Sequence, residues 1–245
     1  MPKISFVMPE KNRGDRIGKT IQTIIDQTEK DFELIIVDDH SDPSDKTEEI
    51  VKTFNDKRIR FIHMPEDLPK GIATARNFGN QFAESSIIAV ADSDDLFKPK
   101  RAELTIKAFK KTNCDVFFAK NDIYDEVKKE FIPPMEDFHS FNVSMLKKRN
   151  YIAHSSSAYK RHLAYEFPYN SFFKKAEDYD LFTRLAVAGK KFYFCDEIVY
   201  TYIIHNENIS RGLRLVNYND LIHLNRGWIK KDRNIVIKGA FGENK

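Results

Sequence analysis

The chain has 245 residues, of which 41% are hydrophobic, and this is enough for one or two domains with a sizeable core. Its 40 Lys and Arg residues nearly balance its 37 Asp and Glu residues, which gives a formal net charge of +3. This composition excludes a disordered chain, a collagen and a disulfide miniprotein. The near-neutral charge argues against general nucleic-acid binding, and every apolar run is far shorter than the roughly 20 residues of a membrane span.

The two cysteines and the start of the chain bear on the cellular compartment. Cys114 and Cys195 lie in apolar stretches, so we expect reduced core residues rather than a disulfide or a metal pair. The apolar run after Met1-Pro-Lys3 has only five residues, too few for the core of a signal peptide. We therefore expect a cytoplasmic protein, with peripheral attachment to a membrane left open because residues 205–245 carry a local charge of +4.

The first half of the sequence alternates short β-rich runs with helical patterns. Strands are predicted over residues 4–8, 32–37, 59–62, 87–91 and 116–119, and helices over 14–27, 44–54, 71–83 and 99–111. This alternation predicts an α/β fold with a mostly parallel sheet and helices on both faces. Ligands of such sheets bind beyond the carboxyl ends of the strands, where polar residues of this chain gather.

The second half is less regular. A long loop is predicted from about 131 to 157, a helix over 178–188, strands over 192–195 and 199–203, and an amphipathic helix over 213–229. We expect one domain over 1–212, made of a nucleotide-binding half (1–119) and a smaller acceptor half (120–212), followed by a helical tail over 213–245. The tail is expected to pack on the body or to form a homodimer.

The strongest chemical signal is the segment Asp92-Ser93-Asp94-Asp95. Side chains two residues apart at a strand end point the same way, so Asp92 and Asp94 are expected to converge. Clustered carboxylates are unfavourable without a cation. Mg²⁺ and Mn²⁺ suit such oxygen ligands and complete their shells with phosphate oxygens. A turn with a helix N-cap is the alternative interpretation, although three Asp residues in four positions are harder to explain that way.

Three other polar segments are each ambiguous alone. Asp38–Asp39 follows a strand, where an acidic residue either binds a nucleoside or forms a turn. Glu177–Asp180 begins a predicted helix, where carboxylates either serve as a general base or stabilise the helix dipole. His205–Arg211 contains groups that can ligate Mn²⁺ and hold phosphate, or it is an ordinary surface loop.

In this order, the segments resemble the GT-A glycosyltransferases of family 2, over residues 3 to about 211. The matching pieces are Ser5–Pro9 with Asn12 and Arg13, Ile36–Ser41, Gly71–Asn77, Ala91–Asp95, Glu177–Asp178 and His205–Arg211. Two positions depart from the family pattern. Glu10 stands where Thr, Ser or Tyr is frequent, and His40 stands where Gly or Asn is usual.

The resemblance implies a GT-A, Rossmann-like fold and inverting transfer of a sugar from a nucleotide diphosphate to a hydroxyl of a glycan or other acceptor, in the setting of polysaccharide biosynthesis. Uridine diphosphate is the default donor nucleotide, with thymidine and guanosine diphosphate left open. It implies Asp178 as catalytic base and Asp94 with His205 as ligands of Mn²⁺ or Mg²⁺. The other implied donor contacts are Pro9 and Arg13 in the nucleotide pocket, Asp39 at the base, Asp92 at the ribose, Asp95 at the donor sugar, and Arg76 and Arg211 at the diphosphate.

Other functions compete with this one. A sugar nucleotidyltransferase is expected to have a Gly-rich loop after the first strand, but the segment Pro9–Gly14 contains one glycine. A haloacid-dehalogenase-type phosphatase carries its Asp-x-Asp after the first strand, whereas here it follows the fourth. A non-catalytic nucleotide-sugar binding protein is expected to lack Asp178 or the pair of Asp92 and Asp94.

Overall fold

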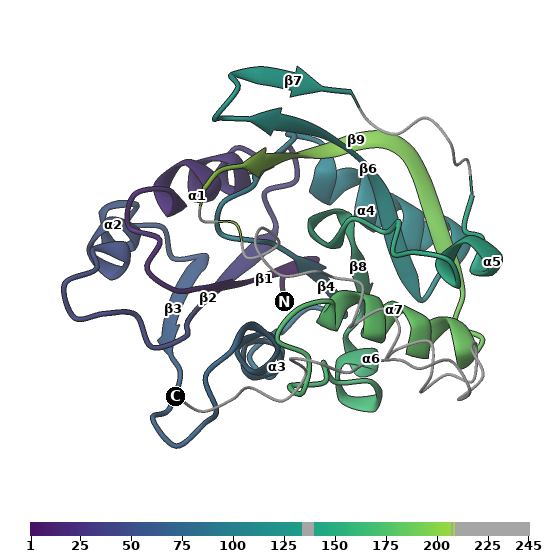
Figure 1. The fold of residues 1–245 in the computed structure, drawn as a ribbon, viewed down its shortest axis with the longest axis horizontal. Coiled ribbons are helices and arrows are strands. Elements are labelled where there is room, and N and C mark those ends of the chain that lie inside the picture. The colour runs from purple at the N-terminus through teal and green to yellow at the C-terminus, as the bar shows by residue number, and fades with distance from the viewer. Residues whose placement is uncertain (134–139, 207, 209–245) are drawn as a thin grey trace, which may run out of the picture.

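The structure is a computed structural model that describes residues 1–133, 140–206 and 208 (Figure 1). The first half runs β1 (Ile4–Glu10), α1 (Ile17–Ile25), β2 (Phe32–Asp38), α2 (Thr47–Thr53), β3 (Ile59–His63), α3 (Ile72–Asn80), β4 (Ile87–Val90), β5 (Leu96–Phe97) and α4 (Arg101–Thr112). The second half runs β6 (Val116–Asp125), β7 (Glu130–Ile132), α5 (Val143–Leu146), the 3₁₀ turn η1 (His154–Ser156), β8 (Ala158–Lys160), α6 (Arg161–Glu166), α7 (Glu177–Val187) and β9 (Phe192–Ile204).

Over the described residues the strands form one sheet in the order β3-β2-β1-β4-β8-β6-β9-β5, with β7 paired to β6. Strands β3, β2, β1 and β4 are parallel to one another, as are β6 and β9. Strand β8 runs antiparallel to both β4 and β6 and so joins the two parallel parts. The predicted α/β class with a mostly parallel, Rossmann-like first half is confirmed.

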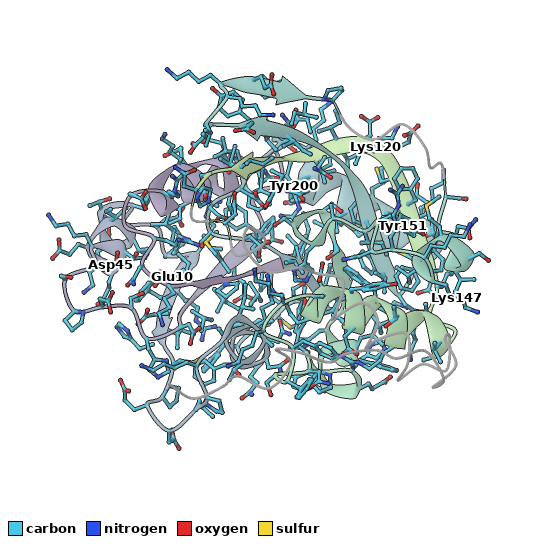
Figure 2. All side chains as sticks on the ribbon, in the orientation of Figure 1. Glu10, Asp45, Lys120, Lys147, Tyr151 and Tyr200 are labelled. Atoms are coloured by element: carbon cyan, nitrogen blue, oxygen red, sulfur yellow. The ribbon has the colours of Figure 1, made fainter. Side chains whose placement is uncertain are left out.

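Helices cover both faces of the sheet (Figures 1 and 2). Apolar residues of α1, α2 and α4 pack on one face together with Phe6 and Met8 of β1. Those of α3, α5, α6 and α7 pack on the other face together with Val7. Because helices cover both faces of the sheet, every residue of β1 and β2 is buried, and most of these residues are apolar.

The structure corrects several predicted elements of the second half. The strands predicted over 192–195 and 199–203 are one strand, β9, in which the pairing with β6 shifts between Cys195 and Ile198. A bulge therefore accommodates the exposed Asp196 and Glu197, which lie between the two predicted strands. The predicted loop over 131–157 contains α5 and η1. The sequence missed β5 and β8 because strands of two or three residues are too short to show a period.

A buried arginine on α4 helps to fix the end of β4. Arg101 is 1% exposed, donates hydrogen bonds to the backbone carbonyls of Val90 and Ser157, and lies 4.4 Å above the ring of Phe97. Burial lowers the pKa of Arg101 to about 9. This side chain joins the last residue of β4 to the segment before β8, directly beneath the loop that carries Asp92.

The remaining predictions concern the cysteines, membrane spans, the C-terminal tail and the division of the domain. Cys114 and Cys195 are buried free cysteines, as expected. No helix among residues 1–133 and 140–206 is long and apolar enough to cross a membrane. The tail predicted over 213–245 lies outside the described residues. The division at residue 119 stays a prediction, and β6 passes through it, so both halves share one sheet.

Candidate functional site

A cavity of about 690 Å³ opens at the carboxyl ends of β1, β2 and β4. Most of the residues singled out in the sequence line it, namely Pro9, Arg13, Asp39, Arg76, Asp92, Asp94, Asp95 and Asp178. His205 follows β9 and contacts Asp94, while Arg211 lies outside the described residues. Segments far apart in the sequence therefore meet in one cavity, where parallel-sheet folds bind ligands.

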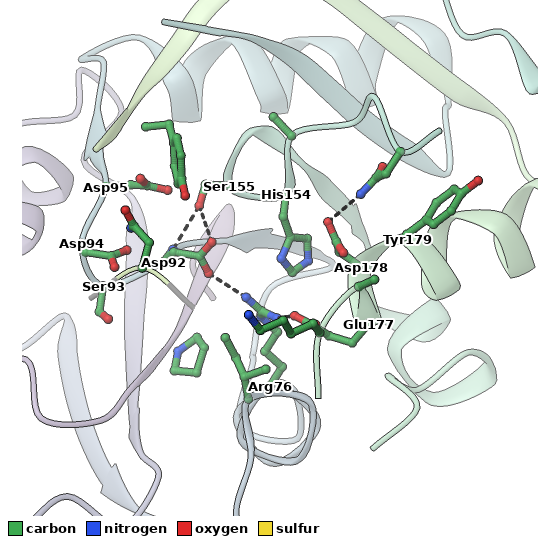
Figure 3. Close-up of a pocket in the computed structure, with 18 of the residues that line it drawn as sticks. Arg76, Asp92, Ser93, Asp94, Asp95, His154, Ser155, Glu177, Asp178 and Tyr179 are labelled. Atoms are coloured by element: carbon green, nitrogen blue, oxygen red, sulfur yellow. Dashed lines mark hydrogen bonds and ion pairs between the residues drawn. The ribbon is translucent and has the colours of Figure 1, made fainter. Parts of the chain in front are cut away.

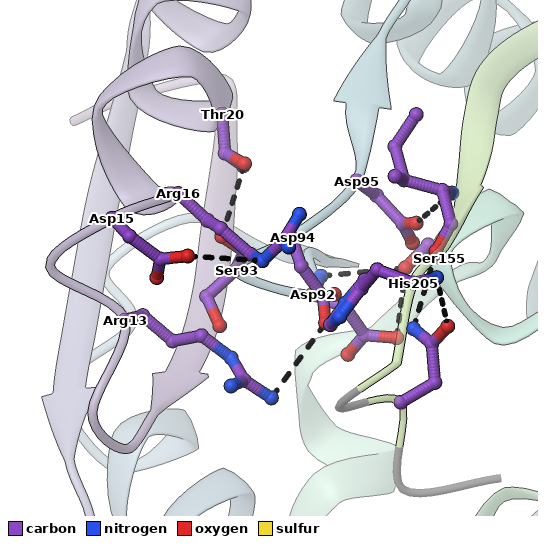
Figure 4. Close-up of polar contacts among 12 residues, drawn as sticks. Arg13, Asp15, Arg16, Thr20, Asp92, Ser93, Asp94, Asp95, Ser155 and His205 are labelled. Atoms are coloured by element: carbon purple, nitrogen blue, oxygen red, sulfur yellow. Dashed lines mark hydrogen bonds and ion pairs between the residues drawn. The ribbon is translucent and has the colours of Figure 1, made fainter. Parts of the chain in front are cut away.

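Asp94 lies between a histidine and an arginine (Figure 4). His205 Nε2 is 3.0 Å from Asp94 Oδ2, and Arg13 Nη2 is 3.7 Å from the same oxygen. His205 is 2% exposed, and its backbone N–H donates to Asn208 Oδ1 at 2.6 Å, which fixes the end of β9. The arrangement brings one carboxylate, one imidazole and one guanidinium to a single corner of the cavity.

The Asp94 and His205 pair fits a divalent cation. Neighbouring ligand atoms of an octahedral Mg²⁺ or Mn²⁺ are about 3 Å apart, and Asp94 Oδ2 and His205 Nε2 are 3.0 Å apart. Nearby, Asp95 is 1% exposed and its Oδ2 lacks a hydrogen bond in the described chain. The described residues contain no group of three or more His, Cys, Asp or Glu side chains placed to hold a metal alone. These two side chains therefore suit an ion that takes its other ligands from a diphosphate and water.

Arg76 lies at the centre of the site (Figure 3). It is 3% exposed, donates to Asp92 Oδ1 at 2.7 Å, and pairs with Glu177 through its other terminal nitrogen. Ser155 Oγ donates to the second oxygen of Asp92 at 2.9 Å. Burial by itself raises the pKa of Asp92, but the guanidinium outweighs it and the pKa is lowered. Asp92 is thus an ionised, fixed carboxylate.

Asp178 is in the first turn of α7. The helix follows Ala176, which has a φ of 60° in the left-handed region that side chains rarely adopt. Asn150 Nδ2 donates to Asp178 Oδ2 at 2.8 Å. Burial, followed by the neighbouring charge of Glu177, raises the pKa of Asp178 to about 7. A carboxylate with a pKa near neutrality, facing a cavity, is suited to accept a proton.

Asp39 is held at the start of α3. Both of its carboxylate oxygens accept from the backbone N–H of Gly71, at 2.9 and 3.1 Å. Gly71 has a φ of 140°, which a residue with a Cβ rarely adopts. Glu10 lines the same end of the cavity and is 3% exposed. Burial and the charge of Asp38 raise the pKa of Glu10 to about 8, so this departure from the family pattern places a largely neutral carboxyl beside Asp38 and Ser41.

Sequence reasoning missed Asn150 and Ser155 as site residues. Both belong to the segment predicted to be a long loop, and nothing in their local sequence distinguishes them from other polar loop residues. His154, between them, also lines the cavity, and its Nε2 is 2.8 Å from the Tyr169 hydroxyl. Burial, followed by the charge of Arg76, lowers the pKa of His154 well below its ordinary value, so this imidazole is neutral.

The sheet order and the polar cavity at its carboxyl edge indicate an α/β enzyme that binds its ligands at this edge. The chain belongs to glycosyl transferase family 2, whose profile matches residues 5–178. It is a glycosyltransferase, and the predicted family and class of enzyme are confirmed.

Two relatives by sequence span most of the chain. It is 31% identical over 214 residues to an uncharacterized glycosyltransferase of Methanocaldococcus jannaschii, covering 84% of this chain and 72% of that protein. It is 27% identical over 232 residues to the poly(ribitol-phosphate) beta-N-acetylglucosaminyltransferase TarP of Staphylococcus aureus, covering 89% and 67%. By contrast, the chain spans only 23% of the hyaluronan synthase of Pasteurella multocida, to which it is 27% identical.

Solved structures establish the same fold. TarS of S. aureus in complex with UDP-GlcNAc superposes with a TM-score of 0.73 at 19% identity, over 91% of this chain and 67% of that one. The mannosyltransferase PcManGT of Pyrobaculum calidifontis, in complex with GDP-Man and Mn²⁺, superposes with a TM-score of 0.65 at 16% identity, over 94% and 65%. The GT-A fold expected from the sequence is thereby confirmed.

Proposed function

We propose that this enzyme transfers a sugar from a nucleotide diphosphate donor, by default a UDP-sugar, to a hydroxyl of a saccharide acceptor with inversion at the anomeric carbon. The observation that carries the proposal is that one cavity holds both Asp94 and Asp178. In Figure 3 they lie on opposite sides of the cluster, with Asp92 and Arg76 between them. A donor diphosphate at Asp94 directs its sugar toward Asp178.

Asp178 acts as the general base. Its carboxylate takes the proton of the attacking hydroxyl in the transition state, which contributes about 10²–10⁴-fold to the rate. The adjacent carboxylate, Glu177, is 7% exposed and paired with Arg76, so it is not placed to form a covalent bond with the sugar. Asp178 is then the carboxylate proposed on the acceptor side, and one base without a covalent nucleophile fits a single displacement and therefore inversion.

Asp94 and His205 would hold a divalent ion at the donor diphosphate. When bound, Mn²⁺ or Mg²⁺ supplies a Lewis acid that stabilises the charge of the leaving diphosphate. Arg13 adds a permanent positive charge 3.7 Å from Asp94. Arg211 is proposed at the same diphosphate, from the part of the chain outside the described residues.

The nucleoside occupies the end of the cavity formed by Pro9 and Asp39. Asp39 is proposed to accept from the base, and Asp92, which Arg76 keeps ionised, to accept from the ribose hydroxyls. The relatives support this class of donor, since TarS was solved with UDP-GlcNAc and PcManGT with GDP-Man and Mn²⁺. Uridine is the default base, and thymidine and guanosine are the alternatives. A cytoplasmic location and a homodimer formed through the tail stay predictions.

The replacement Asp178→Asn tests this proposal. It keeps the shape of the side chain and removes the base, so we expect nucleotide release from UDP-sugars in the presence of acceptors to fall about 10²–10⁴-fold. The affinity for UDP with Mn²⁺, measured by calorimetry, is expected to stay within twofold. Glu197→Gln, an exposed change on β9, is the matched control. Full turnover by Asp178→Asn would refute the assignment of the base.

A further inference from the structure

Apart from residues 205–245, the positive charge of this chain is concentrated in one part of the acceptor half. Residues 140–176 contain seven Lys and Arg residues and one Glu, a formal charge of +6, whereas the whole chain carries +3. Two of these cations serve the fold: Lys160 pairs with Asp115 at 3.0 Å, and Arg161 donates to the backbone carbonyl of Ala83 at 2.8 Å. The other five lie at 147–149 and 174–175, beside the cavity.

Three of these cations line the cavity that contains Asp178, and we refer to Arg149, Lys174 and Lys175 as the cationic rim. They come from two different loops. Arg149 precedes Asn150, whose amide donates to Asp178 at 2.8 Å, and Lys175 lies three residues before Asp178. The rim therefore approaches the proposed base from two sides. Figure 2 labels Lys147 and Tyr151, which lie on either side of Arg149 in the sequence.

The rim makes no ion pair with any carboxylate in the described part of the chain, and Arg149 and Lys174 are exposed. The arginines deeper in the cavity differ in this respect, because Arg13 pairs with Asp94 and Arg76 with Asp92. Cations without a protein counter-ion at the mouth of a cavity concentrate anions there. They are placed to bind a charged group of a ligand rather than to stabilise the fold.

We propose that the acceptor is anionic and carries a phosphodiester or carboxylate close to the hydroxyl that receives the sugar. This inference rests on the proposed function, because it takes Asp178 as the general base that the acceptor hydroxyl must contact. Arg149 offers a planar fork that matches either anion, and the two lysines add point charges. A neutral acceptor would leave all three charges without a counter-ion among residues 1–133, 140–206 and 208.

The donor diphosphate is the rival ligand for the rim. Its negative charge would have partners at the other end of the cavity, in the divalent ion that Asp94 and His205 would hold and in Arg13. If the rim bound the diphosphate, its removal would weaken donor binding. If the rim binds the acceptor, its removal leaves donor binding intact. Removing the rim charges therefore lowers the affinity for the donor under the first assignment and the affinity for the acceptor under the second.

The test uses the full chain loaded with UDP and Mn²⁺, titrated in a calorimeter with three oligomers of similar length. One is a ribitol-phosphate oligomer, one a hyaluronan oligosaccharide and one the neutral chitotetraose. We expect at least one charged oligomer to bind about tenfold or more tighter than the neutral one. Raising the salt from about 50 to about 500 mM is expected to remove most of the difference. The charged oligomer that binds identifies phosphate or carboxylate as the group recognised.

The double variant Lys174→Gln with Lys175→Gln is expected to weaken binding of the charged oligomer about tenfold and to leave UDP affinity within twofold. The matched control is Lys107→Gln with Lys110→Gln, on the exposed side of α4, which is expected to change neither affinity. A lack of preference for charged oligomers, including a lack of measurable binding, would overturn the inference, as would loss of UDP affinity in the rim variant. Failure of the wild-type chain to bind UDP with Mn²⁺ would instead overturn the proposed function.

Discussion

The guanidinium of Arg76 donates to Asp92 at 2.7 Å and is almost fully buried while it does so. Its other terminal nitrogen pairs with Glu177, so one side chain of α3 joins the acidic loop after β4 to the first residue of α7. Burial by itself lowers the pKa of Arg76, but Asp92 and Glu177 outweigh it and the pKa is raised. The charge therefore persists and couples the donor side of the cavity to the helix that carries Asp178.

Replacing Arg76 by Met is expected to destabilise the protein by about 3–5 kcal/mol, because it leaves two buried carboxylates without their partner. Arg76→Lys is expected to recover part of this loss, since a lysine keeps the charge but cannot span both carboxylates with a planar fork. The measurement is urea unfolding. Arg60→Met is the control, because Arg60 is 39% exposed and its ion pairs are 3.6–3.7 Å long. A loss below about 1 kcal/mol for Arg76→Met would contradict the account.

The pairing of Arg76 also shows where sequence reasoning ends. The presence of Asp92 and Asp94 in one cavity follows from their position after an apolar strand of a parallel sheet, so it was predictable from local pattern. The contact of Arg76 with Glu177 joins residues 101 positions apart and depends on how α3 and α7 pack on the same face. The same holds for the burial of Arg101 beneath β4 and for the bond of Asn150 to Asp178. Tertiary packing decides these contacts, and no periodicity encodes it.

The rate of transfer is expected to depend on the protonation of Asp178. Burial and the charge of Glu177 raise its pKa to about 7, and the base acts only when ionised. The value of kcat/KM is therefore expected to fall about tenfold for each pH unit below about 7 and to level off above it. The measurement is a pH profile of kcat/KM at saturating Mn²⁺. If kcat/KM instead falls only near the ordinary pKa of an aspartate, Asp178 is not the titrating base.

The hydrogen bond from Asn150 modifies this titration. Burial dominates the raised pKa of Asp178, and the Asn150 amide opposes it by stabilising the ionised form. Asn150→Ala is expected to move the acidic limb of the profile to higher pH, and Asn150→Asp, which adds a like charge, to move it further. Rates measured at high pH are expected to recover toward the wild-type value in Asn150→Ala. An unshifted limb in both variants would remove Asn150 from this role.

The metal assignment predicts a loss that is specific to donor binding. Asp94→Ala and His205→Ala are each expected to reduce the Mn²⁺-dependent affinity for UDP at least tenfold, because each removes one of two protein ligands. Thermal shift with UDP, with and without Mn²⁺, measures this, since ligand binding raises apparent stability. Chelation of the metal is expected to abolish the shift in the wild-type chain. Mn²⁺-dependent shifts of ordinary size in both variants would place the metal elsewhere.

The position of α3, and with it Arg76, depends on a glycine packed against the sheet. A Cβ at Gly79 would lie 2.7 Å from Val7 Cγ1 and 2.8 Å from Val37 Cγ2, whereas a Cβ at Gly18 of α1 meets its nearest atom at 3.4 Å. Gly18 is the second residue of α1 and Gly79 the second-to-last of α3, so alanine adds at most about 1 kcal/mol of helix propensity at either position. The difference between the two substitutions is therefore a difference in packing.

Gly79→Ala is expected to destabilise the fold by about 1–3 kcal/mol in urea unfolding, while Gly18→Ala is neutral or stabilising. Because Val7 and Val37 belong to adjacent buried strands, the helix must move away from the sheet, and the Arg76 guanidinium moves with it. The rate of sugar transfer is therefore expected to fall by more than the loss of folded protein alone would cause. If Gly79→Ala is as stable and as active as Gly18→Ala, the close approach of α3 to the sheet does not position Arg76.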